Sequence, residues 1–433
     1  MTGLLKLYEI VTSAGGPLLE LLLKSRMKRG KEDPARLPER MGRASRARPS
    51  GHLIWVHAAS VGEAQSAMIL IDAIGRMGSG ISVLVTTGTV TSATLMERRL
   101  PVFAIHQYAP LDRPQWIKTF LDHWRPDTVF WMESELWPNT LQELKRRNIP
   151  AALINARLSD TSFRNWSYAP KPAKTIVSCF DAILAQTEKD ARHYRSLGAE
   201  NVVVTDNIKY SASPLPYDQL ALSALKLAVS DRPVWVYAST HAGEESLTCR
   251  VHKTLKEKYP RLLSIIVPRH PNRRDEIAGV CFENGLKFSL RSHNMALPAI
   301  DDDIYIADTL GELGLFYSLS DIAMIGRSFS DDGGGGHNPV EAAQLDCVVL
   351  TGPNNQFQRQ LYDDMKESSA VIETANEAEL AFTLDDLFSH PQKVIDIKES
   401  TRQFAQRKTY VIERVLEILS PFLALPGGKS HAA

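Results

Sequence analysis

A turn between a short apolar run and a helical stretch carries the first residue that could do chemistry. The sequence HAASVGEAQSA, residues 57–67, places Glu63 directly after Gly62, where the helix should begin. The positive end of a helix dipole favours a carboxylate there, so we expect Glu63 to be ionised near neutral pH. Such a carboxylate can act as a general base toward a substrate hydroxyl. The alternative is a purely structural role at the start of the helix.

A glycine-rich turn is the second candidate, and its chemistry would be anion binding. In FSDDGGGGHNPVEAA, four glycines at 333–336 precede Asn338, Pro339 and Glu341. Glycine lets the backbone approach a ligand closely and adopt positive φ. Asn338 can cap a helix that Pro339 opens, and the amides at such a start bind phosphate. Without Gly-Lys-Ser/Thr it is not a Walker loop, and the alternative is a capped surface turn.

Turns suited to anions recur in the second half of the chain. Arg269 ends an apolar run, and its guanidinium can bind a phosphate or a carboxylate in a forked pair. Residues 309–312, TLGE, have the Ser/Thr-x-x-Glu spacing of a capped helix start. Residues 239–245, STHAGEE, end another apolar run. His241 and His270 are isolated in the sequence, so we predict no metal site at either.

The first half adds two acidic and two basic residues near the ends of apolar runs. Glu133 and Glu135 lie in WMESELWPN, Arg157 lies in NARLS, and Lys209 lies in TDNIKY. Two neighbouring carboxylates are compatible with a glycoside hydrolase. Because they are only two residues apart beyond a strand end, they can equally satisfy Arg157 or a nearby helix terminus.

These turns need a scaffold that brings strand ends together. Apolar, β-branched runs alternate with helical stretches such as 137–147 and 189–197. The runs that we expect to be strands are Leu53–His57, Ser82–Thr86, Phe103–Tyr108, Thr128–Met132, Ala152–Asn155, Ala182–Gln186, Val202–Thr205, Val234–Ala238, Leu263–Val267, Lys287–Leu290, Ile304–Ala307, Ile322–Ile325 and Val348–Leu350. Several are apolar throughout, as buried parallel strands are, so the alternation predicts doubly wound parallel sheets.

A proline-rich break divides this alternation into two series. Residues 211–217, SASPLPY, suit an interdomain linker because proline restricts the chain to extended and turn conformations. We therefore expect an α/β fold with two Rossmann-like domains, residues 51–210 and 218–393. A helical segment and tail, 394–433, then crosses back over one of the two domains. An apolar and basic segment, 1–50, precedes both.

Composition gives no reason to expect a nucleic-acid partner, a disulfide or zinc. The 433 residues include 50 Lys and Arg and 50 Asp and Glu, so the net charge is zero. The cysteines are far apart, lack CxxC spacing and lie in or beside apolar runs, which is typical of reduced packing residues in a cytosolic protein. They are Cys179, Cys249, Cys281 and Cys347.

The amino-terminal segment departs from this neutrality. Residues 4–23 are rich in leucine, but charges and Gly15-Gly16-Pro17 interrupt them, which disfavours a spanning helix. Residues 24–48 then carry ten Lys or Arg against three acidic residues. An apolar anchor followed by a basic patch is typical of a segment at the interface of an anionic membrane. The alternative is a packing helix followed by a solvated basic loop.

Taken together, these motifs resemble those of the 3-deoxy-D-manno-octulosonic acid (Kdo) transferases of bacterial lipopolysaccharide assembly. The resemblance runs almost end to end and includes KRGKEDPARLPERMG, HAASVGE, ESELWPN, NARLS, STHAGEE, VPRHP, DTLGELG and GGHNPVEAA. It implies a GT-B glycosyltransferase, with two Rossmann-like domains facing a cleft, that transfers Kdo with inversion from CMP-Kdo to a lipid A precursor, lipid IVA. It also implies the cytoplasmic face of the inner membrane, anionic lipids as partners, and neither cofactor nor metal.

The resemblance also implies roles for individual residues. It makes Glu63 the catalytic base. It places contacts to CMP at Pro268, Arg269, Leu310, Gly311, Glu312, Asn338, Pro339, Val340 and Glu341. The acceptor side or the cleft is assigned more loosely to Glu133, Arg157, Lys209, Ser239 and Thr240. Two positions depart from the pattern: Gly326-Arg327-Ser328 replaces the usual Gly-Gly-Ser, and Asp206-Asn207 replaces a frequent Gly-Ser.

Two other functions stay compatible with the sequence. One is another GT-B enzyme, such as a sugar-nucleotide 2-epimerase, and the other is a non-catalytic protein that binds lipid A or a nucleotide. Incubation with CMP-Kdo or with UDP-sugars, followed by identification of the nucleotide that is released, distinguishes a Kdo transferase from another GT-B enzyme. An inert binding protein would bind CMP without forming a product.

Overall fold

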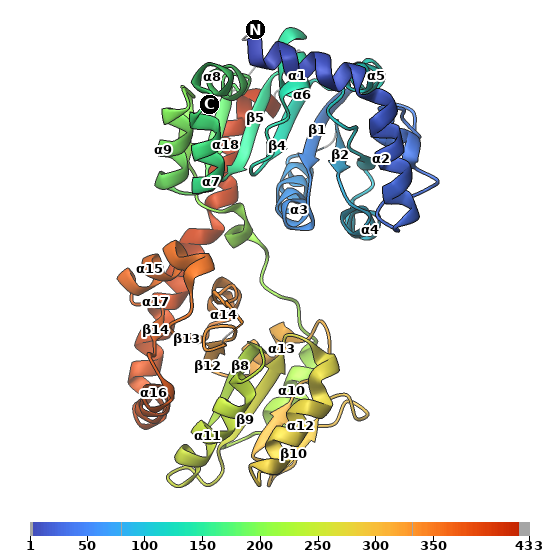
Figure 1. Cartoon of the computed structure of the whole chain (residues 1–433). Helices are drawn as coiled ribbons and strands as arrows, with labels where there is room; N and C mark the ends of the chain where they lie inside the picture. Colours follow the sequence, from blue (N-terminus) through green and yellow to red (C-terminus); the bar gives the residue numbers. More distant parts are fainter. Residues whose placement is uncertain (1–2, 79, 331, 424–433) are drawn as a thin grey trace. The chain divides into compact units, whose positions relative to one another are not determined.

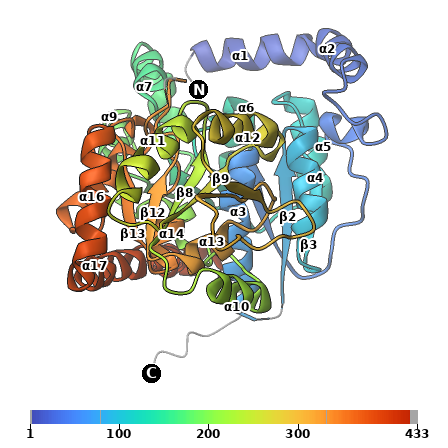
Figure 2. The same cartoon turned by 90° about the horizontal axis from the view of Figure 1, so that it is seen from below.

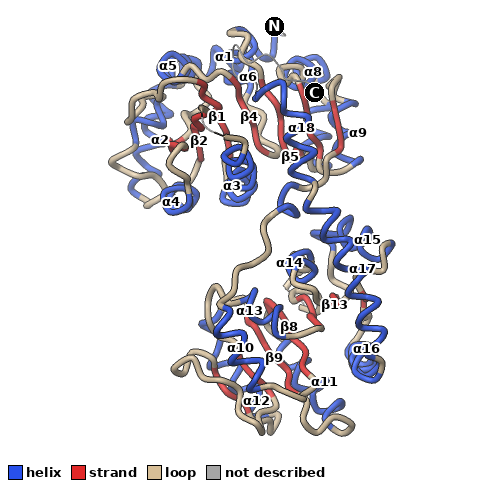
Figure 3. Tube along the Cα trace, turned by 180° about the vertical axis from the view of Figure 1, so that it is seen from behind, coloured by secondary structure: helices blue, strands red, loops and turns tan. Residues whose placement is uncertain are grey.

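Two compact units, each with its own sheet, make up the protein (Figure 1). The residues described by the computed structural model are 3–78, 80–330 and 332–423. Unit 1 contains the described residues up to Ala212 and those from Thr409 onward, and unit 2 contains Ser213–Lys408. The chain therefore passes between the units twice. In each unit the strands form a central layer with helices on both sides (Figure 3).

Seven parallel strands form the sheet of unit 1. They are β1 (His52–Ala58), β2 (Ile81–Thr87), β3 (Ala104–Tyr108), β4 (Thr128–Met132), β5 (Ala151–Ala156), β6 (Ala182–Ala185) and β7 (Val202–Val204). Their order is β3-β2-β1-β4-β5-β6-β7, so the sheet grows from β1 first to one side and then to the other. All carboxyl ends lie at the same edge, where ligands bind in open α/β sheets.

Helices cover both faces of this sheet. They are α1 (Gly3–Ala14), α2 (Gly16–Lys28), α3 (Val61–Arg76), α4 (Val90–Arg99), α5 (Pro114–Trp124), α6 (Pro138–Arg146), α7 (Asp160–Ser167), α8 (Pro170–Val177), α9 (Glu188–Ser196), α18 (Val411–Leu423) and the 3-10 helices η1 (Leu37–Met41) and η2 (Ile208–Ser211). On β1, Leu53 and Trp55 face α5 and its Trp124, whereas Ile54 and Val56 face α3, α4 and α18. The two faces follow from the two-residue period of a strand.

The carboxyl-terminal helical segment is divided between the units. Helix α17 (Pro391–Thr409) belongs to unit 2, where Val394 and Ile397 pack against the core. Helix α18 packs in unit 1 against α3 and the sheet, with Val415 and Leu419 buried. The apolar stripe of α18 thus completes one face of the first sheet, although it follows the whole of unit 2 in the sequence.

An irregular segment after α2 covers the free edge of β3. The carboxylate of Glu39, in η1, accepts a hydrogen bond from the backbone N–H of Tyr108 at 2.7 Å. It also accepts one from the guanidinium of Arg36 at 3.0 Å, and Arg36 donates in turn to the backbone carbonyl of His106 at 3.0 Å. Uncovered strand edges pair with other chains, so these side chains close the sheet at this edge.

We expect Glu39→Ala to destabilise unit 1 by about 3 kcal/mol. Glu39 is buried, and its removal leaves the Tyr108 N–H and most of the Arg36 charge without their partner. Denaturant unfolding followed by a probe in unit 1 measures the change. Glu97→Gln is the matched control, because exposed Glu97 bonds the same guanidinium at 3.3 Å, and it should cost about 0.5 kcal/mol or less. Equal losses for both variants would contradict the edge-closing role.

Seven parallel strands also form the sheet of unit 2. They are β8 (Val234–Thr240), β9 (Leu263–Pro268), β10 (Phe288–Leu290), β11 (Ile304–Ile306), β12 (Ile322–Ile325), β13 (Val348–Thr351) and β14 (Ile372–Glu373). Their order is β10-β11-β9-β8-β12-β13-β14. Because β8 is central and β9 and β12 flank it, the loop after β8 lies between the loops that follow those two strands.

The helices of unit 2 lie on both faces of its sheet. Besides α17, they are α10 (Gln219–Ala228), α11 (Glu244–Lys256), α12 (Arg274–Glu283), α13 (Leu313–Leu319), α14 (Val340–Gln344), α15 (Arg359–Glu367), α16 (Glu377–Ser389) and the 3-10 helices η3 (Pro271–Arg273) and η4 (Gln356–Gln358). Trp235 and Tyr237 of β8 pack with α11 and α16 in one cluster. Ile266 and Ile306 pack with α12 in another. The expected α/β fold with two doubly wound sheets is confirmed.

Candidate functional site

Glu63 lies in the turn between β1 and α3, at the carboxyl edge of the first sheet. Ser60 is the N-cap of α3, and its hydroxyl oxygen accepts a hydrogen bond from the backbone N–H of Glu63 at 3.2 Å. The Glu63 carboxylate turns back and accepts one from the backbone N–H of Ala59 at 2.6 Å. The two bonds fix the carboxylate at the start of the helix. The residue is 6% exposed.

Burial changes the protonation that the sequence predicts for Glu63. Its pKa is raised to about 7, chiefly by burial and further by the negative charges of Glu133 and Glu135, against the opposing hydrogen bond from Ala59. The sequence predicts a carboxylate that is ionised near neutral pH, but this pKa leaves Glu63 only partly ionised there, because desolvation outweighs the hydrogen bonds that favour the charged form. A base whose pKa lies near 7 suits proton transfer at neutral pH.

This pKa predicts the pH dependence of activity. If Glu63 must be ionised to accept a proton, kcat/KM should rise about tenfold per pH unit below pH 7 and level off above it. Steady-state rates between pH 5.5 and 9 measure the profile, and a flat profile up to pH 7.5 would contradict the role of base. The stability of the fold has the opposite pH dependence. The contribution of protonated Glu63 to the free energy of unfolding is fully present below the pKa that Glu63 has in the unfolded chain, and it is lost as the pH rises through about 7.

Glu133 ties the elements around this turn together. Its backbone is left-handed, with φ 56°. Its Oε1 accepts hydrogen bonds from Lys209 Nζ at 3.1 Å, the Ser66 hydroxyl at 3.2 Å and the Asn155 side-chain amide at 3.4 Å. Nζ of Lys209 would lie 3.7 Å from a Cβ on Gly62, so the ammonium lies over the turn that carries the candidate base. Residues from β5, α3 and η2 therefore meet Glu133, which directly follows β4, at one site.

The other charged residues of this half have separate surroundings. Trp137 Nε1–H donates to Glu135 Oε2 at 2.8 Å. Arg157 is exposed, and its backbone N–H donates to the carbonyl of Glu133 at 3.2 Å. The suggestion that the Glu133 carboxylate satisfies Arg157 is wrong, because Lys209 takes that place. The two carboxylates are engaged by different partners, which gives no support to a glycoside hydrolase.

A buried carboxylate organises the corresponding edge of unit 2. Glu244, the first residue of α11, is fully buried and accepts five hydrogen bonds. The donors are the Tyr237 hydroxyl at 3.0 Å, the His241 N–H at 2.9 Å, and the N–H groups of residues 327–329 at 2.8, 2.9 and 2.9 Å. Glu244 thereby joins the loops after β8 and β12. The sequence does not predict this role, because three of the five donors lie more than 80 residues away.

Ser239 and Thr240 also support this edge from within unit 2. The Ser239 carbonyl approaches Gly326 so closely that a Cβ on Gly326 would lie 2.3 Å from it. Thr240 is buried, and its hydroxyl donates to Glu245 at 2.8 Å. Glu245 also accepts a hydrogen bond from Arg273 at 2.8 Å, which links α11 to η3. The Thr240 side chain therefore faces the interior of its own unit.

The turn at Asn338 differs in detail from the predicted cap. Helix α14 starts at Val340, one residue later than expected, and Asn338 Oδ1 accepts a hydrogen bond from the Val340 N–H at 3.1 Å. The Asn338 side-chain amide donates to Glu341 Oε1 at 3.4 Å. Burial raises the pKa of Glu341, against the opposing effects of Asn338 and of the Arg269 charge. Arg269, exposed at the end of β9 after buried Pro268, therefore lies near this turn.

The glycines before this turn are needed by the protein itself. Gly333 and Gly336 have φ of 75° and 72°, as the sequence predicts. A Cβ on Gly334 would lie 2.6 Å from the Arg327 carbonyl, and one on Gly336 would lie 3.1 Å from the Tyr362 ring. The close approach is thus to neighbouring protein atoms. Arg327, one of the two departures from the family pattern, directs its guanidinium to Asp332 at 3.3 Å.

The predicted helix cap at Thr309 is wrong. Helix α13 starts one residue after Glu312, which is its N-cap, so Thr309 lies before the helix. Glu312 forms a forked ion pair with Arg291 at 2.8 and 3.2 Å and accepts a hydrogen bond from the Thr309 hydroxyl. Between them, Gly311 has φ 83° and Leu310 is 82% exposed. Arg291 carries no sequence motif, and only the fold brings it here.

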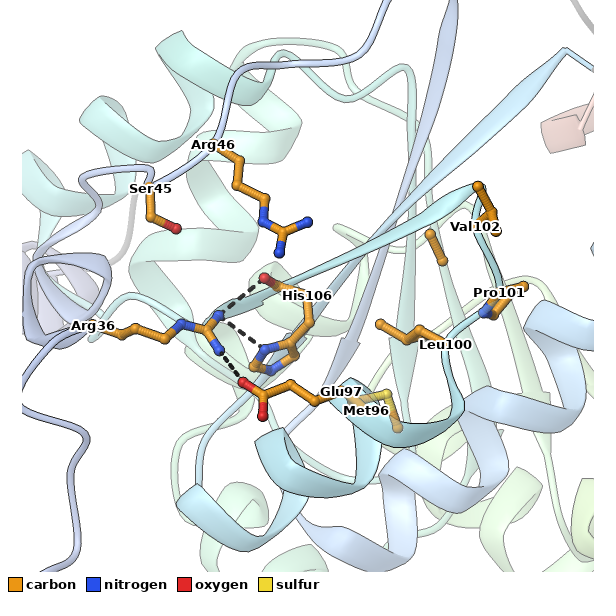
Figure 4. A pocket seen from close by; sticks show the side chains of 10 residues that line it. Arg36, Ser45, Arg46, Met96, Glu97, Leu100, Pro101, Val102 and His106 are labelled. Carbon is orange, nitrogen blue, oxygen red and sulfur yellow. Dashed lines mark hydrogen bonds and ion pairs between the residues drawn. The ribbon is translucent and has the colours of Figure 1, made fainter.

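A cavity of about 460 Å³ lies elsewhere in unit 1, between the segment after α2 and the start of β3 (Figure 4). Arg36, Ser45 and Arg46 line one side, and the turn from α4 to β3 lines the other. Arg36 is bonded to Glu39 and Glu97, whereas the Arg46 guanidinium points into the cavity (Figure 4). No residue of the candidate site lines this cavity.

Helices α1 and α2 lie at the periphery of unit 1 and expose apolar side chains (Figure 2). These are Leu4, Leu7, Ile10, Val11, Leu18, Leu21 and Leu22. Among the described residues, no helix has the length and apolar character needed to cross a membrane. Four of the ten basic residues in 24–48 form ion pairs within the fold, namely Arg26, Arg36, Arg40 and Arg48. The other six are exposed: Lys24, Lys28, Arg29, Lys31, Arg43 and Arg46.

The described part of the chain offers no group of three or more His, Cys, Asp or Glu that could hold a metal ion. All four cysteines are buried free thiols. Cys249 on α11 and Cys281 on α12 approach each other, with their sulfurs 3.9 Å apart.

Comparison with known proteins agrees with this architecture. A glycosyltransferase from Rickettsia africae of known structure covers 87% of the chain and 99% of its own length, with a TM-score of 0.58 at 14% identity. The two parallel α/β units therefore have the GT-B fold. Residues 35–212 match the family model of the 3-deoxy-D-manno-octulosonic acid transferases.

Two curated relatives extend this match to most of the chain. A 3-deoxy-D-manno-octulosonic acid transferase of Rickettsia bellii is 33% identical over 97% of this chain and 100% of its own length. That of Rickettsia felis is 36% identical over 86% of this chain and 79% of its own length. The chain belongs to the Kdo transferase family and is a glycosyltransferase.

Proposed function

We propose that the protein transfers Kdo from CMP-Kdo to a lipid A precursor, lipid IVA, with Glu63 as the general base. Membership of the Kdo transferase family supports the donor and the reaction. The buried Glu63 carboxylate at the carboxyl edge of the first sheet, with its pKa raised to about 7 by burial, carries the assignment of the base. Lys209 and Glu133 lie around it and contribute the acceptor side.

In the proposed reaction, a hydroxyl oxygen of the acceptor attacks the anomeric carbon of Kdo. The new carbon–oxygen bond forms as the bond to the CMP phosphate breaks, and CMP leaves with the bonding electrons on the opposite face. Glu63 takes the hydroxyl proton. Arg269 and the turns at 310–312 and 338–341 hold CMP, and the guanidinium offsets the charge on the leaving phosphate without a metal. The configuration at the anomeric carbon is inverted.

The decisive test is mass spectrometry of lipid IVA incubated with CMP-Kdo and the purified protein. We expect the mass of the lipid to increase by one or more Kdo residues while CMP is released. A parallel incubation with UDP-N-acetylglucosamine tests the alternative of a 2-epimerase. CMP binding without any change in the lipid would reject transfer and favour an inert binding protein.

We propose that unit 1 docks on the cytoplasmic face of the inner membrane through α1 and α2. Their exposed apolar residues and the six exposed basic residues of 24–48 support an interfacial segment on an anionic surface. A lipid acceptor is presented at the same surface, so docking would bring enzyme and acceptor together.

A vesicle-binding experiment tests this docking. Leu18→Ser with Leu21→Ser should weaken binding to phosphatidylglycerol vesicles about tenfold or more, because both side chains are exposed on α2. The matched control is Leu220→Ser with Leu227→Ser, which removes two equally exposed leucines from α10 of unit 2. Equal binding by the two double variants would rule out α2 as the docking element. Loss of vesicle binding in high salt would show that the exposed basic residues contribute to binding by electrostatic attraction.

A further inference from the structure

Three side chains at the edge of unit 2 form a chain of hydrogen bonds that the proposed mechanism does not use. His241 Nδ1 lies 3.0 Å from Asp332 Oδ2, and His241 Nε2 lies 3.0 Å from Nε2 of His337. His241 follows β8, Asp332 belongs to the glycine-rich loop, and His337 directly precedes the turn at Asn338. The loop after β8 and the glycine-rich turn thus contribute to one line of polar atoms.

The charges around this chain decide where its protons lie. The Ser330 hydroxyl and Arg327 hold the pKa of Asp332 below its ordinary value, so its carboxylate is ionised and accepts only. Burial lowers the pKa of His241, against the opposing charges of Asp332 and Glu244, and His241 is therefore neutral above pH 7. Its single proton then lies on Nδ1 and is donated to Asp332.

The second contact fixes the other imidazole. Nε2 of His241 carries a lone pair, so the hydrogen bond to His337 requires the proton to lie on Nε2 of His337. Burial is the main cause that lowers the pKa of His337 to about 4, and the positive charges of Arg269 and Arg327 lower it further, so this ring is neutral as well. Its Nδ1 therefore carries only a lone pair.

Nδ1 of His337 is available to a ligand. No atom of the described residues bonds it, whereas the rest of the residue is held in place: its N–H donates to the Gly326 carbonyl at 3.2 Å, and its carbonyl accepts from the Tyr362 hydroxyl at 2.9 Å. Arg269 acts on the pKa of both His337 and Glu341, so all three lie at one site. The ring of His270 is 6.0 Å from that of His241.

The lone pair selects the kind of group that can bind there. Phosphate and carboxylate oxygens are themselves acceptors, so they repel Nδ1 and suit Arg269 instead. In CMP itself, the ribose is joined directly to the phosphate, and its hydroxyls are donors. We propose that Asp332 and His241 are positioning residues that hold His337 with its proton on Nε2, so that Nδ1 accepts a ribose hydroxyl of the donor nucleotide. This inference rests on the proposed function, which supplies CMP-Kdo as the donor.

Nitrogen NMR of histidine-labelled protein tests the tautomer without any turnover. At pH 7.5 we expect His337 to show a protonated Nε2 and a bare Nδ1, with the signals assigned from the His337→Asn variant. In Asp332→Asn the preference of His337 for a proton on Nε2 should weaken, and a mixture of the two tautomers should appear. A protonated Nδ1 in the parent protein, or an unchanged tautomer in Asp332→Asn, overturns the inference.

CMP titration tests the ribose contact. His337→Gln keeps a group near Nε2 but lacks an acceptor at Nδ1, and it should weaken CMP binding about tenfold. His337→Asn, whose amide oxygen can replace Nδ1, should stay within threefold of the parent, as should the control His293→Gln, an exposed residue of unit 2. The contact involves one of the two ribose hydroxyls. For the analogue that lacks this hydroxyl, either 2′-deoxy-CMP or 3′-deoxy-CMP, His337→Gln should not change the affinity. Equal losses for CMP and both deoxy analogues, or no loss at all, overturn the inference.

The proposed function is tested separately in the same samples. A parent protein that binds CMP through His337 but transfers no Kdo contradicts the proposed function alone. A parent protein that transfers Kdo while His337→Gln binds CMP normally contradicts the ribose contact alone.

Discussion

Glu63→Gln should lower kcat for Kdo transfer about 10³-fold while leaving CMP binding within twofold of the parent. A general base contributes roughly 10² to 10⁴ in rate, and glutamine keeps the size and the Ala59 hydrogen bond of Glu63 but accepts no proton. Release of CMP in the presence of lipid IVA measures the rate, and calorimetry measures CMP binding. The loss should fall on kcat, because the base acts on the acceptor hydroxyl in the transition state.

Stability separates loss of chemistry from loss of fold in this variant. Burial raises the pKa of Glu63 to about 7, so the ionised carboxylate is unfavourable in the folded protein above that pH. Glu63→Gln should therefore be more stable than the parent at pH 8.5, by on the order of 2 kcal/mol. The control is Glu188→Gln, an exposed glutamate that also lies in the first turn of a helix in unit 1. A Glu63→Gln rate within threefold of the parent would falsify the role of base.

The sequence predicts the scaffold well because the strands are apolar along their length. Each of the thirteen expected strands is present, and its ends differ from the expected ones by no more than two residues. The strand Thr128–Met132 matches exactly. The strand that was not predicted, β14, has two residues, too few for any periodicity. The helical segment predicted from residue 394 onward proves to contain parts of two helices, since α17 ends at Thr409 and α18 begins at Val411.

The candidate site is predicted less completely, because burial and distant partners decide its chemistry. The turn position of Glu63 follows from the sequence, but its pKa depends on packing and on Glu133, 70 residues away. Thr309 has the spacing of a cap, yet Arg291 draws Glu312 into an ion pair and the helix starts later. Local spacing identifies turns, whereas the electrostatics of a site depend on contacts between segments.

Glu244 illustrates this limit and leads to the second large effect that we expect. Its carboxylate accepts three hydrogen bonds on Oε1 and two on Oε2, from donors that are buried or partly buried. Glu244→Gln replaces one oxygen by a donor, so at least two backbone N–H groups lose their acceptor. Each buried donor left unpaired costs roughly 1–3 kcal/mol. We therefore expect unit 2 to lose about 4 kcal/mol of stability.

Hydrogen exchange locates this loss. Residues 327–329 donate to Glu244 and lead into the glycine-rich loop, so their amides should exchange at least tenfold faster in Glu244→Gln. CMP should bind more than tenfold more weakly, because the loop that precedes Asn338 is no longer held. Glu377→Gln is the matched control: it also changes the first residue of a helix in unit 2, but Glu377 is partly exposed and pairs with Arg250. It should cost less than about 0.5 kcal/mol.

Glu63, in the first turn of α3, and Glu244, the first residue of α11, both accept a hydrogen bond from a backbone N–H of the preceding loop, but they serve different purposes. Glu63 takes one backbone amide at its own turn and keeps a raised pKa, which suits a group that exchanges a proton. Glu244 takes five donors, which suits a fixed anchor. Faster exchange at 327–329 without weaker CMP binding would show that the anchored loop serves stability alone. Weaker CMP binding with unchanged exchange would mean that Glu244 acts on the nucleotide by another route than this loop.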